Sequence, residues 1–226
     1  MRITMRSVAV ASATTLVTLM WGVPSAGAIA STCMYPPSTP VLSVGLSTTA
    51  PVAGQPVYVR GRLTYNKCGL GGSVITVRAG GKTIGTRTTD STGSYSVRFT
   101  PTVRTSVYAA GTFNQVGVKS RTLGVAVRTN LRGTTAGAAG SCRVTVKGTI
   151  YPVRRGATVV VQRRLTKGAR FIGWATLARP KTNAKGAYGA TIRLACASKA
   201  GLSTYIAPTK LNAANRSATM SVTAKL

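Results

Sequence analysis

Acidic residues and histidine are almost missing from this chain. Its 226 residues include 30 Lys and Arg, one acidic residue, Asp90, and no His, so the formal net charge is +29. A paired-carboxylate mechanism needs two acids, and a hydroxyl nucleophile usually needs a His base. Zinc and two-metal sites draw on His, Cys and carboxylate ligands. The sequence therefore predicts a protein that is not an enzyme and has no metal site and no cofactor.

The shortage of acids also predicts the kind of partner. GC-rich coding explains an abundance of Arg, Ala and Gly, but it would not delete Asp and Glu. Arg outnumbers Lys by 20 to 10, and its planar guanidinium binds phosphate or carboxylate with two parallel hydrogen bonds. A protein this cationic attracts anionic polymers, such as wall polymers, acidic glycans or nucleic acid.

The N-terminal segment has the pattern of a secretory leader. Arg2 and Arg6 precede an apolar run over residues 8–23, and residues 26–28 (Ala-Gly-Ala) form a small-x-small cleavage site. The apolar run is short for a membrane span, which needs about 20 residues. We therefore expect residues 1–28 to be a cleaved signal peptide that leaves no stable membrane span. We expect the protein to be secreted. Its charge is suited to attaching it to the cell wall.

Both halves of the remaining chain alternate as β-strands do. A Gly/Ala/Thr-rich stretch at residues 133–140 separates them, and on each side apolar and polar residues alternate with period two between Gly, Pro and Asn turns. We predict two β domains, 29–129 and 130–226. The residues with inward parity are Val57, Val59, Gly61, Leu63, Ile75, Val77, Tyr95, Val97, Phe99, Leu123, Val125 and Val127 in the first, and Cys142, Val144, Val146, Ile150, Tyr188, Ala190, Ile192 and Leu194 in the second.

One turn motif occurs once in each half. The pattern Thr-[Asp/Asn]-x-x-Gly-x-Tyr occupies residues 89–95 and 182–188. The Asp or Asn side chain caps the backbone of the turn, Gly supplies a positive φ, and Tyr begins the next strand on its core side. The counterpart of Asp90 is Asn183, which cannot ionise. We therefore predict that Asp90 caps a turn and is neither a catalytic nor a metal-binding group.

The residues around this motif resemble a known family. The first motif is followed by residues 99–101 (Phe-Thr-Pro) and 107–109 (Val-Tyr-Ala), and the second half contains residues 159–163 (Val-Val-Val-Gln-Arg) and 173–174 (Gly-Trp). This order resembles the bacterial immunoglobulin-like repeat domains of secreted and surface actinobacterial proteins, although those are less basic. The resemblance implies an all-β fold with two tandem immunoglobulin-like β-sandwiches of seven strands. It implies an extracellular setting but no activity.

Four cysteines, Cys33, Cys68, Cys142 and Cys196, allow three connectivities. None of them stand at C-x-x-C spacing, and cysteines oxidise outside the cytosol, which indicates structural disulfides. The two-domain organisation favours Cys33–Cys68 and Cys142–Cys196. Cys142 and Cys196 both have inward parity, so we expect the second bridge to lie in the core, as in immunoglobulin domains.

Basic residues are denser in the second half. From residue 130 onward there are 17 basic residues and no acid, against 11 and Asp90 in residues 29–129. Two Arg pairs and the connections around them form the predicted polyanion-binding cluster: Arg154, Arg155, Arg163, Arg164, Lys167, Arg170, Arg179, Lys181 and Lys185. The neighbouring Tyr151, Phe171 and Trp174 have rings able to stack on bases or sugars. The family position of Trp174 predicts instead that it packs in the core.

These features predict a secreted, strongly cationic, non-catalytic binding protein that attaches to extracellular polyanions such as anionic cell-wall polymers. Two alternatives stay open. One is a structural or protein-interaction immunoglobulin-like module with an acidic protein partner. The other is an extracellular nucleic-acid binder, although neither a recognition helix nor an aromatic platform is visible. A membrane-active protein also fits the charge, but the sequence has no amphipathic helix.

Overall fold

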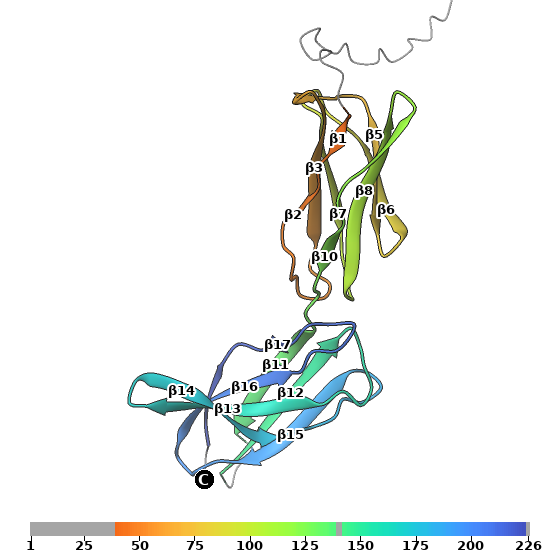
Figure 1. Cartoon of the computed structure of the whole chain (residues 1–226). Coiled ribbons are helices and arrows are strands. Elements are labelled where there is room, and N and C mark those ends of the chain that lie inside the picture. The colour runs from red at the N-terminus through yellow and green to blue at the C-terminus, as the bar shows by residue number, and fades with distance from the viewer. Residues whose placement is uncertain (1–38, 139–141, 225–226) are drawn as a thin grey trace, which may run out of the picture.

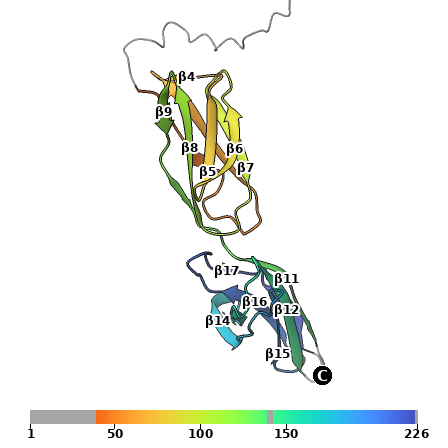
Figure 2. The same cartoon turned by 90° about the vertical axis from the view of Figure 1, so that its right-hand side faces the viewer.

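The computed structural model of the protein describes residues 39–138 and 142–224. Within these residues the chain forms strands and turns, arranged as two β-sandwiches that lie end to end (Figure 1, Figure 2). The first contains β1 (Val41–Leu42), β2 (Gly45–Leu46), β3 (Val57–Tyr65), β4 (Cys68–Gly69), β5 (Val74–Ala79), β6 (Lys82–Thr88), β7 (Ser94–Phe99), β8 (Thr105–Phe113), β9 (Val116–Lys119) and β10 (Leu123–Val125). The second contains β11 (Asn130–Ala138), β12 (Arg143–Tyr151), β13 (Val159–Lys167), β14 (Arg170–Ala178), β15 (Ala187–Arg193), β16 (Lys199–Ile206), β17 (Asn215–Arg216) and β18 (Met220–Thr223).

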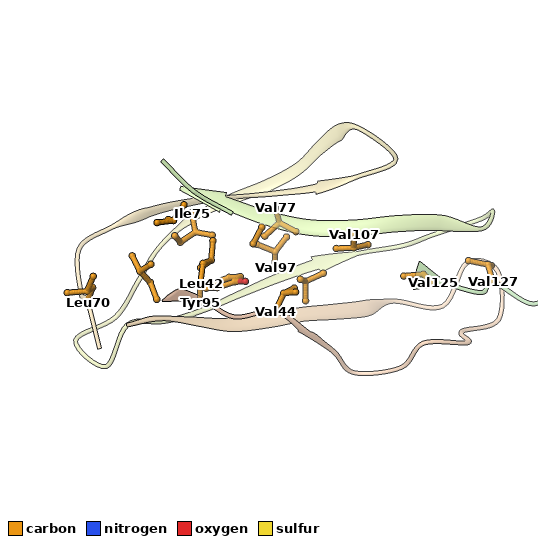
Figure 3. Close-up of a cluster of buried hydrophobic side chains, with 14 of the residues drawn as sticks. Leu42, Val44, Leu70, Ile75, Val77, Tyr95, Val97, Val107, Val125 and Val127 are labelled. Atoms are coloured by element: carbon orange, nitrogen blue, oxygen red, sulfur yellow. The ribbon is translucent and has the colours of Figure 1, made fainter. Parts of the chain in front are cut away.

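The first sandwich encloses a single core between two sheets. One sheet has the order β1-β3-β2, with β4 and β7 also paired to β3, and the other has the order β10-β8-β5-β6, with β9 paired to β8. Figure 3 shows Val97 from one sheet and Ile75 and Val77 from the other meeting in the core. Along β3 the burial alternates, so that Val59 is buried while Arg60 is exposed. The period-two prediction for this segment is confirmed.

The second sandwich is less symmetric. A three-stranded sheet, β11-β12-β15, packs against a sheet with the order β14-β13-β16-β17, in which β18 also pairs with β16. The buried side chains form one cluster that includes Val144, Val146, Val161, Leu202 and Val222 and another formed by Ile150, Val159, Tyr188 and Ile206. Residues 164–172 of the β13–β14 hairpin are all exposed, because the core does not extend beneath them.

The two sandwiches meet at the connection between Val125 and Asn130. The predicted boundary between domains 29–129 and 130–226 lies in this connection, and it stays a prediction. A loop of the second sandwich hydrogen-bonds across this connection. Asn212 Nδ2 donates to the Thr102 carbonyl at 2.9 Å, and the Arg104 amide donates to the Leu211 carbonyl at 2.6 Å. Asn212 is only 2% exposed, so its side chain is buried where the two sandwiches meet.

The predicted disulfide between Cys142 and Cys196 is confirmed, and its Cα atoms are 4.7 Å apart. The expectation that it crosses the core is wrong. Cys142 is buried just before β12, whereas Cys196 is exposed in the turn between β15 and β16. Since β12 and β15 are neighbours in one sheet, the bridge ties together the ends of two adjacent strands. Parity failed because both cysteines lie outside the strands, where alternation no longer sets the direction of a side chain.

Two predictions fall partly or wholly outside the described residues. Cys33 is one of the residues beyond the described range, so the bridge Cys33–Cys68 stays a prediction, as does the signal peptide at residues 1–28. Within 39–138 and 142–224, no helix has the length and apolar character needed to cross a membrane.

Candidate functional site

The single acidic side chain is engaged in a turn. Asp90 Oδ1 accepts hydrogen bonds from the amide and the hydroxyl of Thr92, at 2.9 and 2.7 Å, and from the Ser94 amide at 2.9 Å. The Thr92 hydroxyl bond is the main reason why the pKa of Asp90 lies below its ordinary value of 3.8. Asn183 Oδ1 accepts the equivalent amides of Lys185 and Ala187 at 2.9 and 3.0 Å. The turn-cap prediction for Asp90 is confirmed.

No three side chains of the His, Cys, Asp and Glu types gather into a metal-binding group within the part of the chain that the structure describes. The candidate site is therefore built from cations. The structure distributes the nine predicted residues over three places: the junction between the sandwiches, a pair of loops, and the β13–β14 hairpin.

Arg154 lies at the junction. Its Nη2 donates to Thr129 Oγ1 at 2.9 Å and its Nη1 donates to Thr209 Oγ1 at 3.3 Å. Its Nε is buried without a hydrogen-bond partner among the described residues, and burial lowers the pKa of the guanidinium. The side chain is thus held by Thr129 on the connection between the sandwiches and by Thr209 on the loop after β16, so it is fixed within the protein.

Four of the predicted cations lie on two loops that touch each other. The amides of Gly156 and Ala157 donate to the carbonyl and the hydroxyl of Thr182, at 2.8 and 3.0 Å, which joins the β12–β13 loop to the β14–β15 connection. All four side chains are exposed. This loop group consists of Arg155, Arg179, Lys181 and Lys185.

The hairpin group consists of Arg163, Arg164, Lys167 and Arg170 on β13 and β14. Arg163 is half-buried and the other three are exposed. Lys167 and Arg170 are direct cross-strand partners next to the turn. Lys167 is six residues along β13 from Val161, which pairs with Ala178 at the base of the hairpin. The tip therefore lies about 20 Å from this base, and Arg179 of the loop group follows Ala178 directly. One predicted cluster is therefore two separate surfaces.

An aromatic and arginine ladder lies along the outer face of the same sheet. The rings of Phe171 and Trp174 are 5.7 Å apart, and Arg164 lies 5.5 Å from the Phe171 ring. Arg216 lies 4.4 Å from the Trp174 ring and 5.2 Å from the Tyr205 ring. Trp174 is half-buried on this face and belongs to neither core cluster, so the expected core position is wrong.

Sequence reasoning missed Arg216, which stands on the two-residue strand β17. No local pattern links it to Trp174, since only the pairing of β17 with β16 and of β13 with both neighbours brings the two together. The sequence predicts Tyr151 beside the polyanion-binding cluster, but the structure places it elsewhere. It packs against the core of the first sandwich, with Arg132 4.4 Å from its ring.

The chain matches no protein-family model, and no curated protein sequence matches it. Among solved structures it is similar to a two-domain fibronectin type III segment of chicken tenascin, with 11% identity, a TM-score of 0.47, and coverage of 80% of this chain and 98% of that chain. It is also similar to the D0-D1 domain of intimin, with 12% identity, a TM-score of 0.34, and coverage of 82% and 100%. The BSP domain of a biofilm-associated protein gives 18% identity, a TM-score of 0.28, and coverage of 80% and 30%.

Proposed function

We propose that this protein is a secreted, non-catalytic binding protein that attaches to extracellular polyanions such as anionic cell-wall polymers. The hairpin group, with its exposed Arg164, Lys167 and Arg170, is the main contact, and the loop group is a second one. Guanidinium and ammonium groups in such an arrangement bind phosphate or carboxylate groups spaced along a polymer.

The proposal is supported by the absence of neutralising side chains. The sole acidic residue, Asp90, belongs to the first sandwich, so no side-chain carboxylate of residues 130–226 can pair with the cations there. Uncompensated cations at the surface repel one another, and an anionic polymer relieves that repulsion. Solubility alone would be served as well by charges of both signs.

The observation that carries the proposal is the exposure of the hairpin cations. Arg164, Lys167 and Arg170 stand within seven residues of chain on a hairpin that extends from the side of the second sandwich (Figure 1). Because the hairpin projects, its three exposed cations are accessible to a polymer chain. Arg154, in contrast, is turned into the junction and contributes little to this surface.

A charge-matched pair of variants tests the proposal. One variant replaces Arg164, Lys167 and Arg170 with Gln, and the control replaces the exposed Lys82, Arg87 and Arg98 of the first sandwich with Gln. Both lose three positive charges. Binding to cell-wall material and to inorganic polyphosphate is measured against salt concentration. We expect the hairpin variant to flatten the logarithmic salt dependence by about one unit for each phosphate that the variant no longer binds, while the control stays close to the wild type.

Equal losses of affinity in the two variants would show that net charge alone acts, and an unchanged hairpin variant would overturn the assigned surface. Duplex DNA and poly-glutamate at matched charge concentration separate the alternative functions. Preference for DNA supports a nucleic-acid binder. Preference for the carboxylate polymer supports an acidic protein partner. Wall material that is bound equally with and without its phosphate polymers contradicts the proposal.

A further inference from the structure

The outer part of the β13–β14 hairpin is a free two-stranded ribbon. β16 pairs with β13 only from Val159 to Arg163, and β14 pairs with β13 alone among the described strands. Beyond Arg163 the two arms are therefore paired as strands only with each other, over residues 164–174, which we call the ribbon. An isolated two-stranded hairpin is marginally stable in water, so something besides sheet pairing must support it.

The aromatic and arginine ladder supplies that support. Phe171 contacts Trp174 edge to face, Arg164 covers the Phe171 ring, and Arg216 on β17 covers the Trp174 ring. These contacts hold the base of the ribbon to the sheet through Arg216, which belongs to a different part of the chain. The ribbon is consequently a preformed projection and does not need a partner to order it.

The ribbon exposes apolar side chains between its turn and its base. Leu165, Phe171 and Ile172 are 37%, 44% and 58% exposed and stand within eight residues of chain. A bulge between Leu165 and Thr166 leaves Ile172 without a direct cross-strand partner. Single exposed apolar residues are ordinary, but three of them on one short projecting element mark an interaction surface.

Cations flank these apolar side chains. Arg164, Lys167 and Arg170 are exposed on the same ribbon, and no acidic residue follows Asp90 in the chain. Long basic side chains beside exposed aromatic and aliphatic residues suit the boundary of an anionic bilayer, where the apolar groups enter the acyl region and the cations reach the headgroup phosphates. A soluble polymer would satisfy the cations and leave the apolar side chains in water.

We propose that the ribbon binds the surface of an anionic lipid bilayer, with Leu165, Phe171 and Ile172 inserted at the interface and Arg164, Lys167 and Arg170 on lipid phosphates. The inference rests on the proposed function, since the same cations bind the anions, but it commits them to a lipid surface. The attachment is peripheral, because the ribbon is too short to span the hydrocarbon core.

Trp174 is a built-in reporter for this contact. The chain has two tryptophans, Trp21 and Trp174, and Trp21 lies in the predicted leader. The secreted protein is mixed with phosphatidylcholine vesicles with and without phosphatidylglycerol, and the emission of Trp174 and cosedimentation are recorded. We expect binding and a blue shift with the anionic vesicles only, together with quenching by lipids brominated near the headgroup.

Two variants separate insertion from charge. In the first, Leu165 and Ile172 become Ser; neither side chain makes a ring contact in the ladder, so the ribbon should keep its shape. Its control changes Val74 and Val116, which are 56% and 54% exposed on the first sandwich, to Ser. We expect the ribbon variant to bind anionic vesicles at least tenfold more weakly, with polyphosphate binding unchanged, and the control to match the wild type in both assays.

A third variant, Phe171→Ser, tests the ring inserted next to Trp174, and circular dichroism checks that it folds. The inference would be overturned if both apolar variants still bound vesicles while the variant with Gln at Arg164, Lys167 and Arg170 did not. The protein would then be a polyanion binder only. A wild type that binds polyphosphate and wall material but not anionic vesicles would also overturn the inference. Failure of the wild type to bind any of the three would overturn the proposed function as well.

Discussion

Gly61 and Tyr95 are direct cross-strand partners on β3 and β7, and a methyl group on Gly61 would lie 2.4 Å from the Tyr95 hydroxyl. That hydroxyl donates to the Ser43 carbonyl at 2.6 Å. The second sandwich repeats the arrangement, since Gly148 pairs with Tyr188 and a methyl group there would lie 2.5 Å from the Tyr188 hydroxyl. In each sandwich, a glycine within β3 or β12 therefore makes room for the tyrosine that ends the turn motif.

Replacing Gly61 with Ala should destabilise the first sandwich. The added methyl group would meet the Ser43 carbonyl oxygen as well as the tyrosine ring, so we expect a loss of roughly 1–3 kcal/mol in the free energy of unfolding, as for other overpacked sites. Gly124→Ala is the control, because a methyl group at Gly124 has no neighbour within 4 Å. Urea denaturation measures both. Equal stability of the two variants would contradict the close approach.

Tyr95 should make the protein lose stability in alkali. Burial raises its pKa from 10.0 to about 12. Since the unfolded chain gives up this proton first, the stabilisation is complete below pH 10 and is lost as the pH rises from 10 toward 12, by about 2–3 kcal/mol in total. Tyr95→Phe should be less stable than the wild type at pH 8 by about 1 kcal/mol, for the missing hydrogen bond. Its disadvantage should then shrink between pH 10 and 11.5, and a constant difference would refute the assignment.

Asp90→Asn should lower stability slightly at neutral pH, and its difference from the wild type should shrink in acid. The pKa of Asp90 is lowered, chiefly by the Thr92 hydroxyl bond. The carboxylate therefore stabilises the fold above pH 3.8, and this stabilisation is lost as the pH falls through the lowered pKa. Asn183 already performs the capping role in the second sandwich. Thermal unfolding from pH 2 to 7 should show a weaker acid dependence in the variant. Loss of polymer binding by the folded variant would contradict a purely structural role.

Removing the bridge between Cys142 and Cys196 should destabilise the second sandwich. The bridge closes a loop with a sequence separation of 54 residues, and the chain-entropy description assigns up to about 4 kcal/mol to a loop of that size. We expect the Cys142→Ser, Cys196→Ser variant to unfold at lower urea with a loss of roughly 2–4 kcal/mol. Unchanged stability would mean that strand pairing at this end suffices without the bridge.

Arg154 should prove to be a junction residue and not a polymer contact. Arg154→Leu removes its hydrogen bonds to Thr129 and Thr209, and small-angle scattering should then show a wider range of angles between the sandwiches. Binding to polyphosphate should stay within about twofold of the wild type, since a residue already held by the protein adds little to the salt-dependent contact. A drop in binding as large as that of the hairpin variant would contradict this assignment.

The strands and turns could be predicted because their signals are local. The alternation of Val57, Val59 and Leu63 with basic residues follows from the two-residue period of a strand in a half-buried sheet. The caps at Asp90 and Asn183 depend on atoms no more than four residues away. The pairing of Cys142 with Cys196 followed from the two-domain organisation, but its position at the ends of two adjacent strands did not.

The candidate surface was less predictable. Arg154 and Arg163 look alike in the sequence, yet one enters the junction and the other stands on the hairpin. Trp174 has the alternation of a strand residue, but it lies on the outer face of its sheet, where its ring contacts Arg216 of β17. These differences depend on which face of a sheet is covered and on where the sandwiches meet, and period-two alternation alone carries no information about either.

The sequence by itself determined the all-β fold, the repeated turn and the large positive charge, because alternation, turn chemistry and composition act over a few residues or over the whole chain. Tertiary structure alone decided which cations share a surface, which one is held at the junction, and that apolar side chains accompany the hairpin cations. Those outcomes follow from strand pairing, which brings together residues such as Trp174 and Arg216 that are distant in the chain.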